Sequence, residues 1–391
     1  MDFNEFLDIQ LKDLENKGLR RSLKTVSGMQ SSLVLIDGKK YLNFCSNNYL
    51  GLANDSRLGQ AALNSLKQGG IGAGASRLVC GNIDQHRELE KTLAEFKGTE
   101  SCLLFSTGYM ANLGIISSLF NRHDVIFSDR LNHASIIDGI QLSGAAMKRY
   151  PHCDMDALEK MLKEDACLGK RAIITDTVFS MDGDIAPLHD IVDLAKKYDC
   201  IVIVDEAHGF GVFGENGRGV VEHFGLEDDI DVQMGTLSKA AGCFGAYVCG
   251  SQKLIDFLIN KARSFIYTTG MPPMMAAAGK RAVEIIKSEA QTRKALWENT
   301  NYMRASLKMT GFNTLKSTTP IIPIVIGDNE KTVEFSKRLY EKQVLIGAIR
   351  PPTVPENTAR LRMTMMVSHT KKEIDWVLDN LQRIGKELCL I

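Results

Sequence analysis

Three stretches of the sequence, RAIITDTVFS (171–180), CIVIVDEAH (200–208) and DVQMGTLSK (231–239), decide the fold. Each begins as a run of apolar residues and ends in polar or charged ones. Similar apolar runs lie at SCLLF (101–105), DVIFSD (124–129) and GAYVCG (245–250). Amphipathic helical stretches separate these runs, and this alternation indicates a mostly parallel sheet with helices on both faces. The sequence therefore predicts an α/β fold.

The predicted sheet occupies only the middle of the chain. We predict an N-terminal arm over residues 1–45, a large domain over 46–285 and a small C-terminal α+β domain over 286–391. Within the arm we expect a helix over 1–20 and then a hairpin, because Asp37-Gly38 is a strong turn signal. The C-terminal domain is expected to mix helices with a few strands.

The composition excludes several classes of protein. The chain has 391 residues, equal numbers of basic and acidic residues and 44% hydrophobic residues. A zero net charge gives no general attraction to nucleic acid or to anionic membranes. No apolar run reaches the roughly 20 residues of a membrane span, and the N-terminus has no signal-peptide pattern. The nine cysteines form no CxxC pair, so we expect buried free thiols, no metal site and a cytoplasmic location.

The predicted strand ends carry the candidate chemistry, because ligands of parallel sheets bind beyond the carboxyl ends of the strands. Asp205 and His208 follow one strand, Lys239 follows another and Ser180 a third. The DEAH tetrapeptide (205–208) also occurs in nucleotide-hydrolysing helicases, where the acidic residue holds magnesium. That interpretation requires a phosphate loop of the form GxxxxGK[ST], which the sequence lacks.

Lys239 and Asp205 together favour pyridoxal phosphate as the cofactor. A buried lysine among small, uncharged neighbours has a lowered pKa, so its free amine can form a Schiff base with the cofactor's aldehyde. A carboxylate facing the pyridine nitrogen keeps that nitrogen protonated, and the ring then accepts electrons. Either residue alone is more simply explained as a solvated turn or a surface loop. It is their joint occurrence at two strand ends that favours the cofactor.

A phosphate group needs backbone N–H groups at a helix start together with hydroxyls. The segment FSTGYMAN (105–112) provides a strand followed by a helix start, with Gly108 and Tyr109 at the junction. Thr236 offers a hydroxyl beside the lysine loop. His133 follows another predicted strand, where it is placed to stack on a flat ring, although a histidine there can also cap the helix.

The sequence resembles the α-oxoamine synthases, a family of fold-type-I pyridoxal-phosphate enzymes. The resemblance runs from about residue 40 to the C-terminus, nearly the whole chain. It implies a large domain with a mostly parallel central sheet between helices, plus a smaller C-terminal domain. The matching motifs are NFCSNNYLGL (43–52), GIGAGASRLVCGN (70–82), FSTGYMAN (105–112), DRLNHASIIDG (129–139), VFSMDGDIAPL (178–188), IVDEAHGFGVFGENGRG (203–219), GTLSKAAGCFGAYVCG (235–250) and IYTTGMPP (266–273).

The stretch AIRPPTVPENTARLRMTMM (348–366) is most similar to the alanine-using branch of this family, which serves biotin synthesis. The resemblance implies an acyltransferase that joins L-alanine to a pimeloyl group carried on CoA or on a carrier protein, with loss of carbon dioxide and of the thiol. It also implies a homodimer with shared active sites. Two alternatives stay open: a glycine-using relative such as 2-amino-3-oxobutyrate CoA ligase, and a catalytically silent pyridoxal-binding protein.

The resemblance also implies roles for residues that match its motifs. Lys239 would form the Schiff base and transfer the proton at the α-carbon, and Asp205, His133 and His208 would be the other catalytic residues. Further cofactor contacts would come from Gly108, Tyr109, Ser180 and Thr236 in one subunit and from Thr268 and Thr269 in the other. The substrates would contact Arg20, Asn47, Thr353 and Arg362, with Asn47 and Arg362 at the amino-acid carboxylate.

Overall fold

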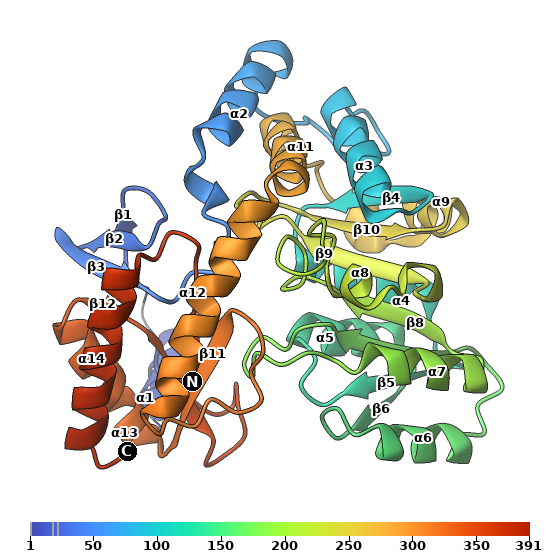
Figure 1. Ribbon diagram of the computed structural model, residues 1–391. Coiled ribbons are helices and arrows are strands. Elements are labelled where there is room, and N and C mark those ends of the chain that lie inside the picture. Colours follow the sequence, from blue (N-terminus) through green and yellow to red (C-terminus); the bar gives the residue numbers. More distant parts are fainter. Residues whose placement is uncertain (1, 18, 22) are drawn as a thin grey trace.

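In the computed structural model, which describes residues 2–17, 19–21 and 23–391, the large domain is built on a seven-stranded sheet (Figure 1). Its strand order is β4 (Ser101–Phe105), β10 (Ala246–Gly250), β9 (Val232–Thr236), β8 (Ile201–Asp205), β7 (Arg171–Asp176), β5 (Val125–Asp129) and β6 (Ala146–Tyr150). All neighbours from β9 to β6 are parallel, whereas β10 runs antiparallel to both of its neighbours. The prediction of a mostly parallel α/β sheet is confirmed.

Helices cover both faces of this sheet, because its strands are apolar on both sides. In β7, the adjacent residues Ile173 and Ile174 are buried in two different core clusters, one on each face. One layer contains α4 (Gly108–Leu119), α5 (Ala134–Ser143), α9 (Gln252–Lys261) and α10 (Arg263–Ile266). The opposite layer contains α3 (Asp84–Lys97), α6 (Met155–Glu164), α7 (Leu188–Tyr198), α8 (Val220–Phe224) and α11 (Pro273–Ser288), with α2 (Ser56–Gly69) packed on α11.

The small domain is built on an antiparallel sheet of β11 (Ile321–Gly327), β14 (Ala359–Thr364) and β13 (Gly347–Ile349). Its helices are α12 (Ala290–Met309), α13 (Asn329–Glu341) and α14 (Lys371–Glu387). Helix α14 begins with a reciprocal cap, in which Thr370 and Glu373 satisfy each other's backbone N–H groups. In Figure 1, α12 links the two domains, because it starts beside α11 and ends within the small domain.

The N-terminal arm pairs with the small domain. The predicted hairpin forms from β2 (Leu33–Ile36) and β3 (Lys39–Asn43), and Asp37 and Gly38 at its turn both have positive φ. Strand β1 (Val26–Ser27) extends this sheet on one side and β12 (Val344–Leu345), parallel to β3, extends it on the other. Helix α1 (Phe3–Asn16) is shorter than the predicted helix over 1–20 and buries none of its side chains.

The cysteines are less buried than the sequence suggested. Cys102 and Cys249 lie in the core, but Cys80 and Cys389 are exposed, so the prediction of buried thiols is wrong for these two. Both lie in turns, one in the 70–82 segment and one beyond α14. Among the described residues, no helix is both long and apolar enough to cross a membrane.

Candidate active site

The loop that carries Lys239, here termed the lysine loop, follows β9 and is held by hydrogen bonds between its own residues. The Gly242 N–H donates to the Lys239 carbonyl at 2.9 Å, and Thr236 Oγ1 accepts from the Ser238 N–H at 3.2 Å. Gly242 has φ +62°, and a β-carbon there would lie 2.2 Å from the backbone nitrogen of Ala53. Glycine is therefore required at this position, because the loop packs directly on the segment that leads from the arm into α2.

Lys239 lines a cavity of about 180 Å³ at the carboxyl ends of the strands. No hydrogen bond or ion pair of its amine is formed with the residues that the structure describes. The structure brings together eight of the residues predicted for the site: Gly108, Tyr109, His133, Ser180, Asp205, His208, Thr236 and Lys239. They come from five segments of the large domain, each at the end of a strand, as the parallel sheet requires.

Asp205, the last residue of β8, is buried at the floor of the cavity with 6% exposure. Its Oδ2 accepts a hydrogen bond from Asn112 Nδ2 at 2.9 Å, and its Oδ1 accepts one from the Ala207 N–H at 2.8 Å. Asn112 also donates to Ser135 Oγ at 2.9 Å. A carboxylate held in this way presents a fixed negative charge to any ring nitrogen in the cavity.

Both histidines of the cavity favour the neutral form. Burial lowers the pKa of His133, and Asp205 opposes this only partly. Burial and the nearby Lys239 and Arg362 cations lower the pKa of His208 well below its usual value. His133 caps α5 through Nδ1, as the structural interpretation of this residue foresaw, and its ring also lines the cavity. Its backbone N–H donates to Asp176 Oδ2 at 2.9 Å.

Lys239 also has a perturbed pKa. Burial lowers the pKa of its amine to about 8, although the carboxylates of Asp205 and Asp176 act in the opposite direction. Burial, together with the charge of Asp205, raises the pKa of Asp176 well above its ordinary range. The cavity therefore holds an amine that is partly neutral near physiological pH, which is the reactive form of a lysine.

The residues of the cavity fit pyridoxal phosphate. Gly108 and Tyr109, at the N-terminus of α4, line the cavity together with Thr236 and Ser238, and a helix N-terminus with nearby hydroxyls suits a phosphate. Asp205 supplies the carboxylate that a pyridine nitrogen needs, and Lys239 supplies the amine. The Tyr109 hydroxyl is hydrogen-bonded to Asp138 and does not reach into the cavity in this arrangement.

Arg362 approaches the cavity from the small domain. It lies on β14, and its Nε donates to the carbonyl of Ser180 at 2.6 Å. Its two terminal nitrogens contact Thr364 Oγ1 at 3.0 Å and Asn47 Oδ1 at 3.3 Å. All of these partners are neutral, so within the described part of the chain no carboxylate pairs with this 9%-exposed guanidinium.

Six predicted residues do not line this cavity: Asn47 and Arg362 lie beside it, and four others lie elsewhere in the chain. Thr268 and Thr269 lie beside Arg77 and His86, and Thr269 forms a β-bridge with Ser76. Arg20 forms an exposed ion pair with Glu15, and Thr353 lies in a turn closed by a backbone hydrogen bond to Arg350.

Asp176, Asn112 and Tyr49 are among the residues of the site that were not predicted. Asp176 ends β7 as Asp205 ends β8, so the same strand-end signal was present in TDTVFS. Asn112 lies one helical turn after Gly108, on the face of α4 that looks into the site. Tyr49 donates to or accepts from His208 Nδ1 at 2.6 Å, a contact that depends on the docking of the arm and has no local signature.

Comparisons with known proteins agree with this arrangement. A family model described as aminotransferase class I and II matches residues 39–381. The chain is 52% identical over 381 residues to a putative 8-amino-7-oxononanoate synthase from Acetivibrio thermocellus, covering 97% of this chain and 98% of the relative. It is 48% identical over 384 residues to an 8-amino-7-oxononanoate synthase from Geobacter sulfurreducens, covering 98% of each chain.

Solved structures extend the similarity to the fold. A serine palmitoyltransferase from S. paucimobilis, solved with a bound PLP–myriocin aldimine, superposes with a TM-score of 0.94 at 32% identity and full coverage of both chains. The two proteins therefore share the whole architecture, including the arm and the small domain.

Proposed function

The chain belongs to the aminotransferase class I and II family and, within it, to the pyridoxal-phosphate acyltransferases of the α-oxoamine synthase type, and on this premise we propose that it condenses L-alanine with a pimeloyl thioester. The products are 8-amino-7-oxononanoate, carbon dioxide and the free thiol. The names of the relatives support this choice of substrates within the family.

One observation carries the proposal: among the residues that the structure describes, the Arg362 guanidinium has no carboxylate partner, and it lies beside the cavity that holds the unpaired amine of Lys239. An α-amino acid brings one carboxylate and one amino group, which are the complements of Arg362 and of the Lys239 site. Arg362 binds the carboxylate through its terminal nitrogens, because its Nε already donates a hydrogen bond to the Ser180 carbonyl. Asn47, which contacts the same guanidinium, is the second residue at the carboxylate.

The residues of the cavity have distinct tasks. Bound pyridoxal phosphate supplies the electron sink for the charge left when the α-carbon loses its proton. Lys239 holds the cofactor covalently at rest and, once displaced, removes that proton as a free amine, for which a pKa of about 8 is suited. Asp205 would hold the ring nitrogen of the cofactor in its protonated form, and His133, which lines the same cavity and favours its neutral form, would contact the ring without adding a positive charge.

The α-carbon then attacks the thioester carbonyl, and the thiol leaves. The resulting β-keto acid loses carbon dioxide, because the new ketone and the ring both accept the electrons of the broken bond. By resemblance, Arg20 is assigned to the acyl substrate and Thr353 to substrate binding. The donor is a pimeloyl group on CoA or on a carrier protein.

The proposal includes a homodimer whose sites are shared. Thr268 and Thr269 do not line the cavity of Lys239 in their own chain, which supports a role at a partner's phosphate. The same surface exposes large apolar side chains, with Ile71 at 71%, Val79 at 79% and Tyr267 at 72% exposure. Apolar groups exposed to this degree in neighbouring loops are typical of a protein–protein contact.

The substrates are tested directly by mass spectrometry of the products. Cofactor-loaded protein is incubated with L-alanine, glycine or L-serine, each with pimeloyl-CoA and, separately, with a pimeloyl carrier protein. We expect 8-amino-7-oxononanoate from L-alanine with at least one donor. Product from glycine instead would identify a glycine-using synthase, and no product from any combination would refute the proposed function.

A further inference from the structure

Residues 177–186, here termed the 177–186 loop, connect β7 to α7 and carry Ser180 to the cavity. The loop is closed by its own backbone, since the Phe179 N–H donates to the Asp184 carbonyl at 3.1 Å and the Gly183 N–H donates to the Phe179 carbonyl at 2.9 Å. It therefore moves as one unit, and whatever holds one end of it also sets the position of Ser180.

On one side the loop is bound to β14 of the small domain. Arg362 Nε donates to the Ser180 carbonyl at 2.6 Å, and Arg360 Nη1 donates to Asp182 Oδ1 at 2.7 Å. The Arg360–Asp182 pair is largely buried, with 4% and 19% of the side chains exposed. The orientation of the Arg362 guanidinium thus depends on where the loop lies.

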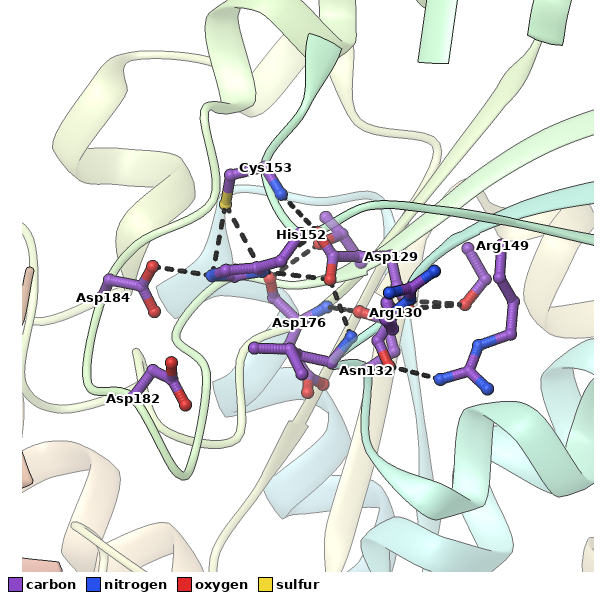
Figure 2. Close-up of polar contacts among 12 residues, drawn as sticks. Asp129, Arg130, Asn132, Arg149, His152, Cys153, Asp176, Asp182 and Asp184 are labelled. Carbon is purple, nitrogen blue, oxygen red and sulfur yellow. Dashed lines mark hydrogen bonds and ion pairs between the residues drawn. The ribbon is translucent and has the colours of Figure 1, made fainter. Parts of the chain in front are cut away.

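On the other side the loop is bound to the large domain through His152 (Figure 2). Its Nε2 lies 2.8 Å from Asp184 Oδ2 in the loop, and its Nδ1 lies 3.1 Å from Asp129 Oδ1 at the end of β5. Asp129 is 1% exposed and is itself fixed by the backbone N–H groups of Leu131 and Cys153. His152 therefore connects the loop to a rigid point of the central sheet.

The imidazole of His152 is a cation in this position. Burial lowers its pKa, but the hydrogen bonds to Asp129 and Asp184 outweigh burial and raise the pKa to about 12. Both ring nitrogens consequently carry protons, and each donates to a carboxylate. Near neutral pH, therefore, both contacts are charge-assisted hydrogen bonds.

A metal ion is the alternative occupant of this cluster, because Asp129, His152 and Cys153 all carry ligand atoms. The position of the sulfur argues against it. Cys153 Sγ lies 3.7 Å from both ring nitrogens of His152, which places it over the face of the ring. A metal bound to histidine lies in the ring plane at about 2 Å from one nitrogen, so this sulfur does not share a metal with the ring.

We propose that His152 is a positioning residue for the amino-acid carboxylate site: by tying Asp184 to Asp129, it holds the Ser180 carbonyl where Arg362 Nε must meet it. The guanidinium is thereby turned so that its terminal nitrogens face the substrate. The inference rests on the proposed function, because it takes Arg362 as the partner of the substrate carboxylate. His152 touches neither substrate nor cofactor and acts only through the loop.

The test compares His152→Gln with His189→Gln, an exposed histidine on α7, in the cofactor-loaded protein. L-Alanine binding is followed by the change in cofactor absorbance, and kcat and KM are measured separately. We expect His152→Gln to bind alanine about 10- to 100-fold more weakly, the size of one lost charge-assisted hydrogen bond. Cofactor content and kcat should change less than about twofold by the same reasoning, and His189→Gln should match the wild type.

A second variant distinguishes the loss of this one contact from a general loss of structure. Asp184→Ala removes only the loop-side partner and leaves the Asp129–His152 pair in place. It should weaken alanine binding as His152→Gln does, and the double variant should lose no more than either single one, because both act through one contact. Hydrogen exchange at the Phe179 and Gly183 amides should be faster in all three variants.

Wild-type alanine affinity in His152→Gln, with faster exchange in the loop, would overturn the inference. Additive losses in the double variant, or a fall in kcat with KM unchanged, would overturn it as well. The proposed function fails differently, because the wild type itself would then not respond to alanine. In that case the comparison is made with glycine or L-serine, which carry the same carboxylate, and no response to any of the three overturns both.

Discussion

Burial of Lys239 lowers the pKa of its amine to about 8, and this value predicts how the protein takes up its cofactor. Only the neutral amine attacks an aldehyde, so covalent attachment of pyridoxal phosphate to cofactor-free protein should accelerate about tenfold per pH unit up to pH 8 and then level off. A lysine with an unperturbed pKa would continue to accelerate to about pH 10. Rapid mixing followed by absorbance measures the rate.

Lys239→Met is the negative control for this experiment and should attach no cofactor covalently at any pH. Borohydride reduction followed by peptide mapping checks that the label lies on Lys239 in the wild type. A rate that still rises between pH 9 and 10 would mean that the amine is not perturbed by its surroundings.

For individual residues, the sequence predicted which residues form the site better than it predicted which side chains contact one another. Lys239 and Asp205 were identifiable because each follows an apolar strand, and parallel strands deliver their ends to one edge of the sheet. The sequence did not identify the residues that hydrogen-bond to the site, because Asn112, the partner of Asp205, lies on a helix, and Tyr49, the partner of His208, lies in the segment between the arm and α2. Which side chains meet across separate segments depends on tertiary packing, which no local pattern encodes.

A buried ion pair connects the end of helix α3 to the residue that directly follows β8. Lys97, the last residue of α3, is 1% exposed and lies 2.8 Å from Glu206, which is 0% exposed and directly follows Asp205. Removing one partner of a buried pair leaves the other charge unpaired, so Lys97→Met should destabilise the protein by about 3–5 kcal/mol. The shift of the denaturant midpoint, with the m-value checked for change, measures this loss.

The exposed pair Lys91–Glu95 on the same helix provides a matched control, with side chains 79% and 68% exposed. Lys91→Met should change stability by less than about 1 kcal/mol, because exposed pairs contribute little. The double variant Lys97→Met/Glu206→Gln should regain part of the loss. Equal effects of Lys97→Met and Lys91→Met would show that burial does not govern the strength of this pair.

The elements that the sequence predicted are those with strong apolar runs. Six of the seven strands of the large sheet were identified in this way, whereas β6 (AMKRY) was not. Strand β6 lies at the edge of the sheet, and its Lys148 and Arg149 interrupt the apolar pattern. An edge strand faces solvent along one side, so composition alone marks it poorly.

The proposed homodimer predicts complementation between two inactive variants. Lys239→Ala removes the amine of its own site, and Thr269→Glu places a carboxylate against the partner's phosphate. In a mixed dimer one site carries both lesions and the other carries none. Mixing the two proteins under conditions that exchange subunits should restore activity, up to about half of the wild-type value for each mixed dimer by counting sites.

If Thr269 served its own subunit, every site of the mixed dimer would carry a lesion and no activity would return. Native mass spectrometry identifies the mixed dimers, so that absence of exchange is not mistaken for absence of complementation. Each variant alone, exchanged with itself, gives the baseline.

The parallel pairing of β3 with β12 has a consequence for the order in which the chain folds during synthesis. Leu42 of the arm pairs with Val344, a residue made about 300 positions later. At a synthesis rate of roughly 5–20 residues per second, the hairpin waits about 15–60 s for that strand. Throughout this interval Leu42 lies on an open strand edge, which is a template for pairing with other chains. The strands of the large sheet, which all lie between residues 101 and 250, are made before β12. The nascent chain therefore carries the strands of the cofactor domain and an unpaired arm edge at the same time.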